Sequence, residues 1–206
     1  MPRTTRSRST MARGRTASAP LRRLIDAAME LERRTMHLYC KLEAQFGESE
    51  ELRAFWFDMA QHESRHFGAL ALVAGLLESA STRSVRPVAA LTPARVQHLR
   101  RLLTRFHAEV EQGVTAERAF EIALEIEGSE IEDVVLDLLQ VLKGEAERER
   151  ATKLLIHDLG DLSYMIEKHT SNHGLLARAD ALLEKQVGRW RSRLPKGKHP
   201  GRRVKG

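Results

Sequence analysis

Cysteine, proline and aromatic residues are scarce in this chain of 206 residues. Its single cysteine, Cys40, allows neither an internal disulfide bond nor a four-cysteine iron site. Any redox chemistry would therefore need an external electron donor, and a reducing, cytoplasmic location is expected. Six prolines, 13 glycines and 5% aromatic residues, with no alternating strand pattern, favour an all-α protein. We expect Cys40 to be a small, buried or partly buried residue rather than a catalytic thiol.

Long apolar runs are also lacking. No stretch of the sequence has the length and apolar character of a membrane-spanning helix, so no membrane contact is expected. Residues 1–20 are basic but contain no apolar stretch of the kind found in a signal peptide. The length suits one substantial domain with a well-packed core.

Acidic residues are missing from both ends of the chain. Residues 1–23 contain 7 arginines, residues 185–206 contain 9 lysines and arginines, and the residues between them carry 18 basic and all 28 acidic side chains. We predict a basic disordered tail over 1–20, a globular body over 21–184 and a second basic tail over 185–206. We expect the tails to provide solubility, or the N-terminal tail to reflect a translation start assigned upstream of Met11. The alternative is that the tails attract nucleic acid non-specifically.

The apolar periodicity of the body is helical throughout. It predicts long helices over 21–46, 50–79, 115–143 and 145–183, the last with an alternative end at Trp190, and a shorter helix over 93–112. The shorter helix begins with Thr92 as its N-cap and Pro93 at the first helical position. The order of these helices is a hairpin, a crossover with a short helix and a second hairpin. This order predicts a four-helix bundle with one long crossover.

The second long helix carries an acid and an imidazole on its apolar face. Glu63 and His66 are three residues apart, with Met59, Leu70 and other apolar residues on the same side. An ionised carboxylate in a dry core costs several kcal/mol unless a charge compensates it. Glu-x-x-His on a bundle helix is a known way to hold iron or manganese, so we predict a metal site here.

Other helices place similar side chains on their apolar faces. Glu32 interrupts the apolar face of the first helix, and Glu127 that of the third, where Glu130 is the alternative. On the fourth helix His173 continues the stripe of Leu155, Leu159, Leu162 and Ile166, and His169 lies one turn earlier. His62, next to Glu63, is expected at the surface. Each helix therefore brings at least one potential metal ligand toward the axis of the bundle. The candidates are Glu32, Glu63, His66, Glu127 and His173, with His169 as an additional candidate.

The spacing of these residues resembles a known family. Four motifs are similar to those of rubrerythrin-type, ferritin-like diiron-carboxylate proteins, here without a rubredoxin domain. They are Glu32 with Tyr39, Phe55-Trp56, Glu63-Ser64-Arg65-His66 and Ala123-Leu124-Glu125-Ile126-Glu127. The resemblance covers about residues 21–183. It implies a ferritin-like four-helix bundle, with Glu32, Glu63, His66 and Glu127 as metal ligands. It further implies a cofactor of one or two iron ions, or manganese, with Tyr39 bonded to a metal-bound carboxylate.

The chain departs from that family in two places. Thr170 stands where a glutamate of a second Glu-x-x-His motif is expected, although His173 is retained. Val134 occupies the position of a family tyrosine on the third helix. With one carboxylate fewer, one ion is easier to hold than two. His169, or Glu167 if the helix is distorted, are the alternative ligands on the fourth helix.

The resemblance implies an oxidoreductase that reduces peroxide or oxidises ferrous iron. It would require an external electron donor, and pairing into a homodimer is a further expectation. Two alternatives stay open on the sequence. The chain could be a degenerate ferritin-like domain with a structural or regulatory role, which Thr170 favours. It could also be a protective protein that binds nucleic acid through its basic tails.

Overall fold

The structure is a computed structural model that describes residues 18–79, 92–129, 136 and 144–193. Within these ranges the chain forms helices and no strand, which confirms the all-α prediction. No helix in the described part is long and apolar enough to cross a membrane. The predicted tail over 1–20 and most of the second tail lie outside the described residues.

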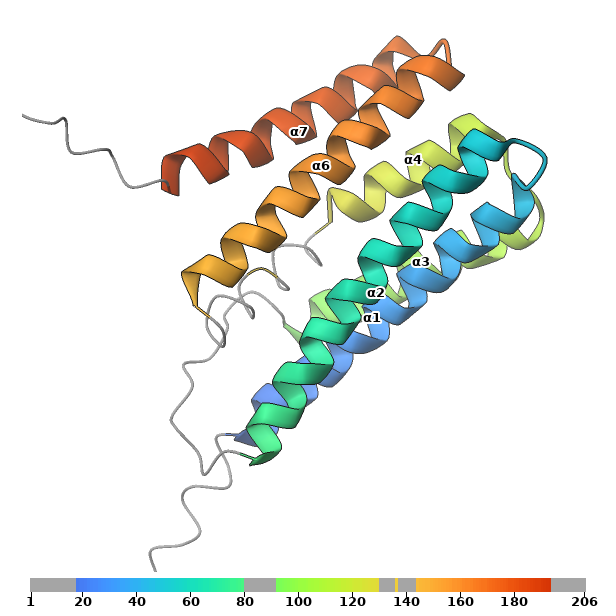
Figure 1. Ribbon diagram of the computed structural model, residues 1–206. Coiled ribbons are helices and arrows are strands. Elements are labelled where there is room, and N and C mark those ends of the chain that lie inside the picture. The colour runs from blue at the N-terminus through green and yellow to red at the C-terminus, as the bar shows by residue number, and fades with distance from the viewer. Residues whose placement is uncertain (1–17, 80–91, 130–135, 137–143, 194–206) are drawn as a thin grey trace, which may run out of the picture.

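Helices α1 (Ser18–Gln45) and α2 (Glu50–Ser79) form a long antiparallel hairpin (Figure 1). Both match the predicted ranges closely. The tight connection begins where the amide of Phe46 donates to the carbonyl of Leu42, and the hydroxyl of Ser49 accepts from the amide of Leu52 at 3.3 Å. These bonds end one helix and begin the next within a few residues, which keeps the two helices in contact.

Helix α3 (Pro93–Glu111) packs against α1. The hydroxyl of Thr92 accepts from the amide of Arg95 at 3.3 Å, so the predicted N-cap is confirmed. On the flank, the guanidinium of Arg100 is paired with Glu30 of α1. The short helix of the predicted crossover therefore covers the outer face of the first hairpin.

Helix α4 (Ala116–Glu127) begins at Thr115, whose hydroxyl accepts from the amide of Arg118 at 3.2 Å. Its C-terminal cap is Gly128. The sequence predicted one helix continuing to Lys143, but α4 ends at Glu127 and residues 128–129 are not helical, so that prediction was wrong at this point. Most of residues 130–143 lie outside the described residues. Helix α4 packs against α6 and so connects the two halves of the molecule.

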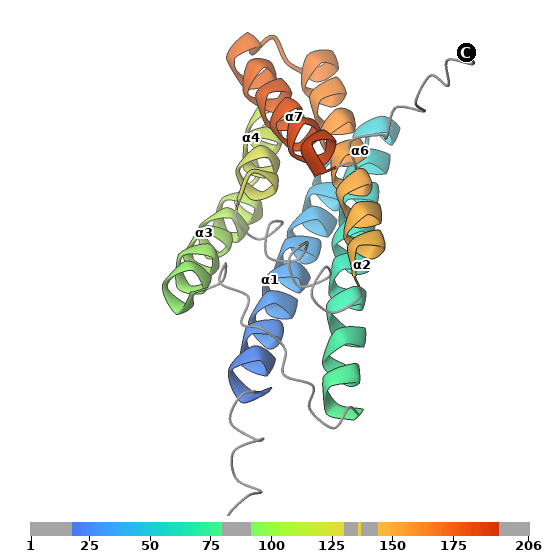
Figure 2. The same cartoon turned by 90° about the vertical axis from the view of Figure 1, so that its left-hand side faces the viewer.

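Helices α6 (Glu145–His169) and α7 (His173–Arg193) are two helices rather than one, so the prediction of a single fourth helix was wrong (Figures 1 and 2). The chain reverses at Thr170–Asn172, and the two helices run antiparallel beside each other. The reason is local capping. The side chain of Asn172 accepts from the amide of Leu175 at 2.9 Å and starts α7.

Helix α7 continues to Arg193, a little beyond the alternative helix end predicted at Trp190, so residues 185–193 are helical. The expectation for Cys40 needs correction. Cys40 is exposed on α1 rather than buried or partly buried. Partial desolvation and the nearby Glu43 carboxylate raise the pKa of its thiol, which disfavours the reactive thiolate.

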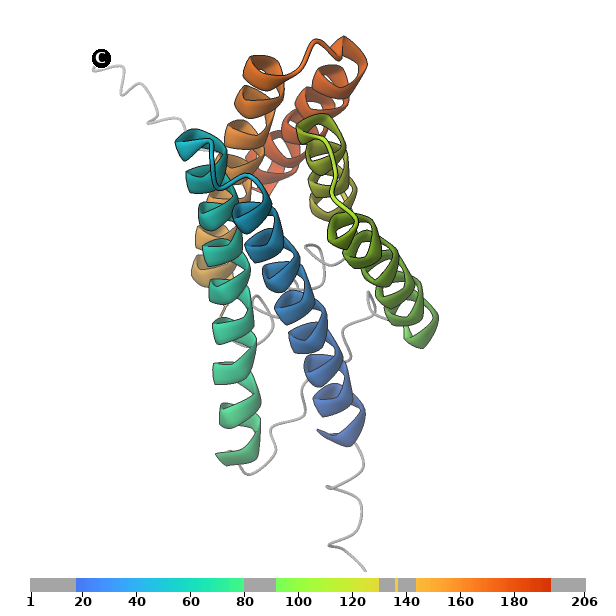
Figure 3. The same ribbon diagram turned by 90° about the vertical axis from the view of Figure 1, so that its right-hand side faces the viewer.

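An aromatic cluster joins α1, α2 and α4. Trp56 is fully buried, and its ring centroid lies 5.9 Å from that of Tyr39, 4.8 Å from Phe55 and 5.5 Å from Phe120. Large rings at these separations contribute both apolar burial and favourable edge and stacking contacts. This cluster fixes the three helices that carry Glu32, Glu63 and Glu127. Figure 3 shows these helices from the side opposite to that of Figure 2.

Candidate metal centre

Three of the predicted ligands meet in the interior. Glu32 of α1 and Glu63 and His66 of α2 each offer one ligand atom, and these atoms all lie within 4.8 Å of one another. His66 Nδ1 is 3.6 Å from Glu32 Oε2 and 3.6 Å from Glu63 Oε2. The side chains are 0%, 3% and 10% exposed for Glu32, Glu63 and His66. A buried Glu–Glu–His group that could hold a metal ion is thus present.

The local sequence explains why these side chains point inward. Glu63 and His66 are one helical turn apart, flanked on the same face of α2 by buried Met59 and Leu70. Glu32 follows buried Ala28 by one turn on α1. Because α1 and α2 are antiparallel and in contact, the two polar interruptions of their apolar faces meet.

The electrostatics of this group favour a cation. Burial and the neighbouring Glu32 carboxylate raise the pKa of Glu63 well above its ordinary value, and the nearby His66 only partly offsets this. Two carboxylates in contact in a dry interior repel each other and lose their hydration. Without a compensating charge, Glu63 therefore tends to retain a proton.

Missing hydrogen bonds among the described residues also favour a cation at this group. Neither oxygen of Glu32, nor Oε2 of Glu63, has a hydrogen-bond partner among the described residues. Buried carboxylate oxygens normally accept hydrogen bonds, and leaving them without a donor costs free energy. Ligand atoms about 2.1 Å from one octahedral ion lie about 3 Å apart when adjacent and about 4 Å apart when opposite. The observed separations fit one ion after small side-chain adjustments.

Glu127 is buried but is not part of the group within 4.8 Å. The hydroxyl of Tyr39 on α1 donates to Glu127 Oε1 on α4 at 2.8 Å. The resemblance implied a bond between Tyr39 and a metal-bound carboxylate, and the structure contains the Tyr39–Glu127 bond itself. Such a bond orients the carboxylate and lowers the cost of burying its charge.

Comparisons of the chain with protein-family models, with curated proteins and with solved structures gave no match. Its function must therefore be inferred from the residues of the site.

The fourth-helix candidates do not join the buried group. His173 is exposed at the first residue of α7, so the expected inward orientation was wrong. The reason is the helix break, which removes His173 from the apolar stripe of α6. The Nε2 atom of His169 is 3.1 Å from Glu51 Oε2 and is half-buried at the end of α6. Thr170 donates to the carbonyl of Ile166 at 2.9 Å.

The remaining alternatives are placed as follows. Glu125 is half-buried on α4 and pairs with Arg105 of α3, whereas Glu167 is exposed on α6. Glu130 and Val134 lie outside the described residues. Among the described acids of α4, Glu127 is therefore the better candidate.

One pair of ionisable groups was missed by sequence reasoning. His62, expected at the surface, is 17% exposed, and its Nδ1 lies 2.7 Å from Oδ1 of Asp158 on α6, which is 5% exposed. A signal for Asp158 was present in the sequence. It falls on the same helical face as buried Leu155 and Leu162, as Glu63 does on α2.

Proposed function

We propose that this chain is a rubrerythrin-type, ferritin-like protein that binds iron, or manganese, between Glu32, Glu63 and His66. The observation that carries the proposal is the convergence of two carboxylates and one imidazole in the interior, with both Glu32 oxygens lacking a donor among the described residues. Carboxylate and imidazole ligands suit these metals. The antiparallel α1–α2 hairpin supplies all three ligands, as the first half of such a bundle would.

The charge of the group suits one divalent ion. Glu32 and Glu63 together neutralise two positive charges, and His66 adds a neutral ligand. A second ion would need further carboxylates, of which Glu127, buried on α4 and hydrogen-bonded to Tyr39, is a candidate. This matches the expectation from Thr170, which removes one carboxylate from the family's usual set.

The proposed activity is the reduction of peroxide or the oxidation of ferrous iron. Iron bound here would supply a centre that changes oxidation state and has coordination positions open to an oxidant. Glu32, Glu63 and His66 would hold that centre in a dry interior, and Glu63 would have to lose its proton to bind the cation. Two electrons and two protons convert peroxide to two waters. The electrons come from an external donor, since the single Cys40 allows no four-cysteine iron site.

Metal titration of the purified protein tests this function. Anaerobic addition of Fe²⁺ should saturate the wild-type protein, and the loaded protein should consume peroxide in the presence of an external reductant. Glu63→Gln and His66→Ala should each weaken Fe²⁺ binding by at least tenfold and abolish peroxide consumption. Glu50→Gln, at the exposed start of α2, is the matched control and should behave as wild type. Equal binding by all four proteins would contradict the proposal.

A second candidate function is a ferritin-like domain with a structural or regulatory role. The observation that favours it is that α6 and α7 contribute no ligand to the buried group among the described residues. Under this alternative the protein binds no metal, and its melting temperature is the same with and without Fe²⁺. The titration above distinguishes the two functions.

A further inference from the structure

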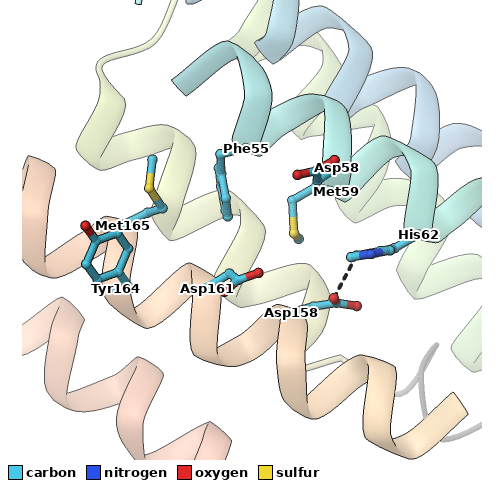
Figure 4. Close-up of a pocket in the computed structure, with 8 residues that line it drawn as sticks. All are labelled: Phe55, Asp58, Met59, His62, Asp158, Asp161, Tyr164 and Met165. Carbon is cyan, nitrogen blue, oxygen red and sulfur yellow. Dashed lines mark ion pairs between the residues drawn. The ribbon is translucent and has the colours of Figure 1, made fainter. Parts of the chain in front are cut away.

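A second polar cluster lies between α2 and α6, on a different helix pair from the buried group. It lines a surface cavity of about 150 Å³ (Figure 4). His62 and Asp58 come from α2, and Asp158 and Asp161 come from α6. Apolar walls are supplied by Phe55, Met59 and Met165, and the exposed Tyr164 also lines the cavity.

The close approach of His62 and Asp158 is not an ordinary hydrogen bond. Nδ1 of His62 and Oδ1 of Asp158 are 2.7 Å apart, yet neither atom has a hydrogen-bond partner among the described residues. The two atoms are near each other but not aligned for donation. Adjacent ligands of a single metal ion have this relation, because both lone pairs point at the ion rather than at each other.

The charge of the cavity is strongly negative. Three carboxylates line it, and no lysine or arginine does. The other ionisable lining residues are His62 and Tyr164, and an exposed histidine, His157, lies 3.1 Å from Asp161 Oδ2 through its Nδ1. Asp158 is 5% exposed, so its carboxylate is desolvated, and the three lining carboxylates together carry more negative charge than one imidazole can balance.

We propose that this cavity is a second divalent-cation site, with His62 and Asp158 as direct ligands and Asp161 and Asp58 as outer carboxylates. A nitrogen and several oxygen ligands suit Mn²⁺, Fe²⁺ or Zn²⁺. A volume of about 150 Å³ accommodates the ion with a few waters, since each water occupies about 30 Å³ in the liquid. The site is open to solvent, so it exchanges its ion more readily than the buried group does.

Mn²⁺ binding to the full-length protein, measured by electron paramagnetic resonance, tests the site. Asp158→Asn and His62→Ala should each remove one bound Mn²⁺ per chain, or weaken its binding by at least tenfold. Asp161→Asn, at a largely exposed position, should weaken it several-fold without affecting folding. His37→Ala, an exposed histidine on α1, is the control and should change nothing. Unchanged Mn²⁺ binding in all three cavity variants would overturn the proposal.

The same experiment separates this site from the buried group. In Glu63→Gln the ion bound in the cavity should remain, whereas in Asp158→Asn the ion bound by the buried group should remain. In the Glu63→Gln background, Mn²⁺ should broaden the imidazole NMR signals of His62 much more strongly than those of His37. Loss of all binding in Glu63→Gln, with no broadening at His62, would show that the cavity binds no ion of its own.

Discussion

At the residue scale, the bond between Tyr39 and Glu127 is a buried contact between residues 88 positions apart. A hydrogen bond to a buried charged acceptor contributes about 1.5–3 kcal/mol. We therefore expect Tyr39→Phe to lower the free energy of unfolding by about 2 kcal/mol, measured by urea denaturation. Tyr164→Phe, at an exposed position, should change it by less than about 0.5 kcal/mol. Equal effects of the two variants would show that the Tyr39–Glu127 bond contributes nothing.

The raised pKa of Glu63 gives a pH dependence with a defined sign. In the metal-free protein the folded state binds this proton more tightly than the unfolded state. The free energy of unfolding of the metal-free protein therefore falls as the pH rises from about 4.5, the ordinary pKa of this side chain, through the raised pKa of Glu63. A metal ion needs the deprotonated carboxylate, so the affinity for Mn²⁺ should rise about tenfold per pH unit until that pKa is passed.

Urea denaturation of the metal-free protein at several pH values measures the first effect, and calorimetric titration with Mn²⁺ measures the second. Glu63→Gln removes the titrating group and should flatten the stability profile over the same range. A Glu63→Gln profile that follows wild type would mean that another group causes the dependence.

The burial of the candidate metal ligands on α1, α2 and α4 was largely predictable, because each of these polar side chains interrupts the apolar face of its helix. Glu32, Glu63, His66 and Glu127 were all identified from periodicity as buried polar side chains. Periodicity could not show which of them meet, because that depends on the register between helices. Glu127 lies on the expected side of its helix, yet the group within 4.8 Å does not include it.

At the scale of the helices, the reversal at Thr170–Asn172 is the main difference from the sequence prediction. The stripe of apolar residues continues through this segment, so periodicity favoured one helix. The side chain of Asn172 instead caps the start of a new helix, and a capping effect of this kind is not visible in the periodicity of apolar residues. The same reversal placed His173 at the surface.

Asn172→Ala tests the capping explanation. Loss of an N-cap side chain costs about 1 kcal/mol, so the free energy of unfolding should fall by that amount. The bond from Asn172 Nδ2 to Glu117 Oε1 at 2.7 Å would be lost as well, which acts in the same direction. Ser171→Ala, at an exposed neighbour, should cost less than about 0.5 kcal/mol. A cost for Asn172→Ala no greater than that of Ser171→Ala would contradict the explanation.

At the scale of the whole molecule, a bound cation should stabilise the fold. Glu32 on α1 and Glu63 on α2 are far apart in an unfolded chain, so an ion binds both only in the native state. At a free metal concentration 100 times the Kd, binding adds about 2.7 kcal/mol. For a protein of this size that corresponds to an increase in Tm of about 5–10 °C.

Thermal denaturation with and without Mn²⁺ measures this stabilisation. Because Asp158→Asn leaves the buried group intact, most of the increase in Tm should remain in that variant. It should be much reduced in Glu63→Gln. An increase that is identical in wild type and in Glu63→Gln would assign the stabilisation to another part of the molecule.

The central claim is that Glu32, Glu63 and His66 share one cation. Anomalous X-ray scattering from crystals grown with Mn²⁺ tests it most directly. We predict an anomalous peak between the three side chains, with a carboxylate oxygen of each glutamate and a ring nitrogen of His66 about 2.2 Å from it. Well-ordered side chains with no peak between them, at Mn²⁺ concentrations that saturate the protein in solution, would contradict the account.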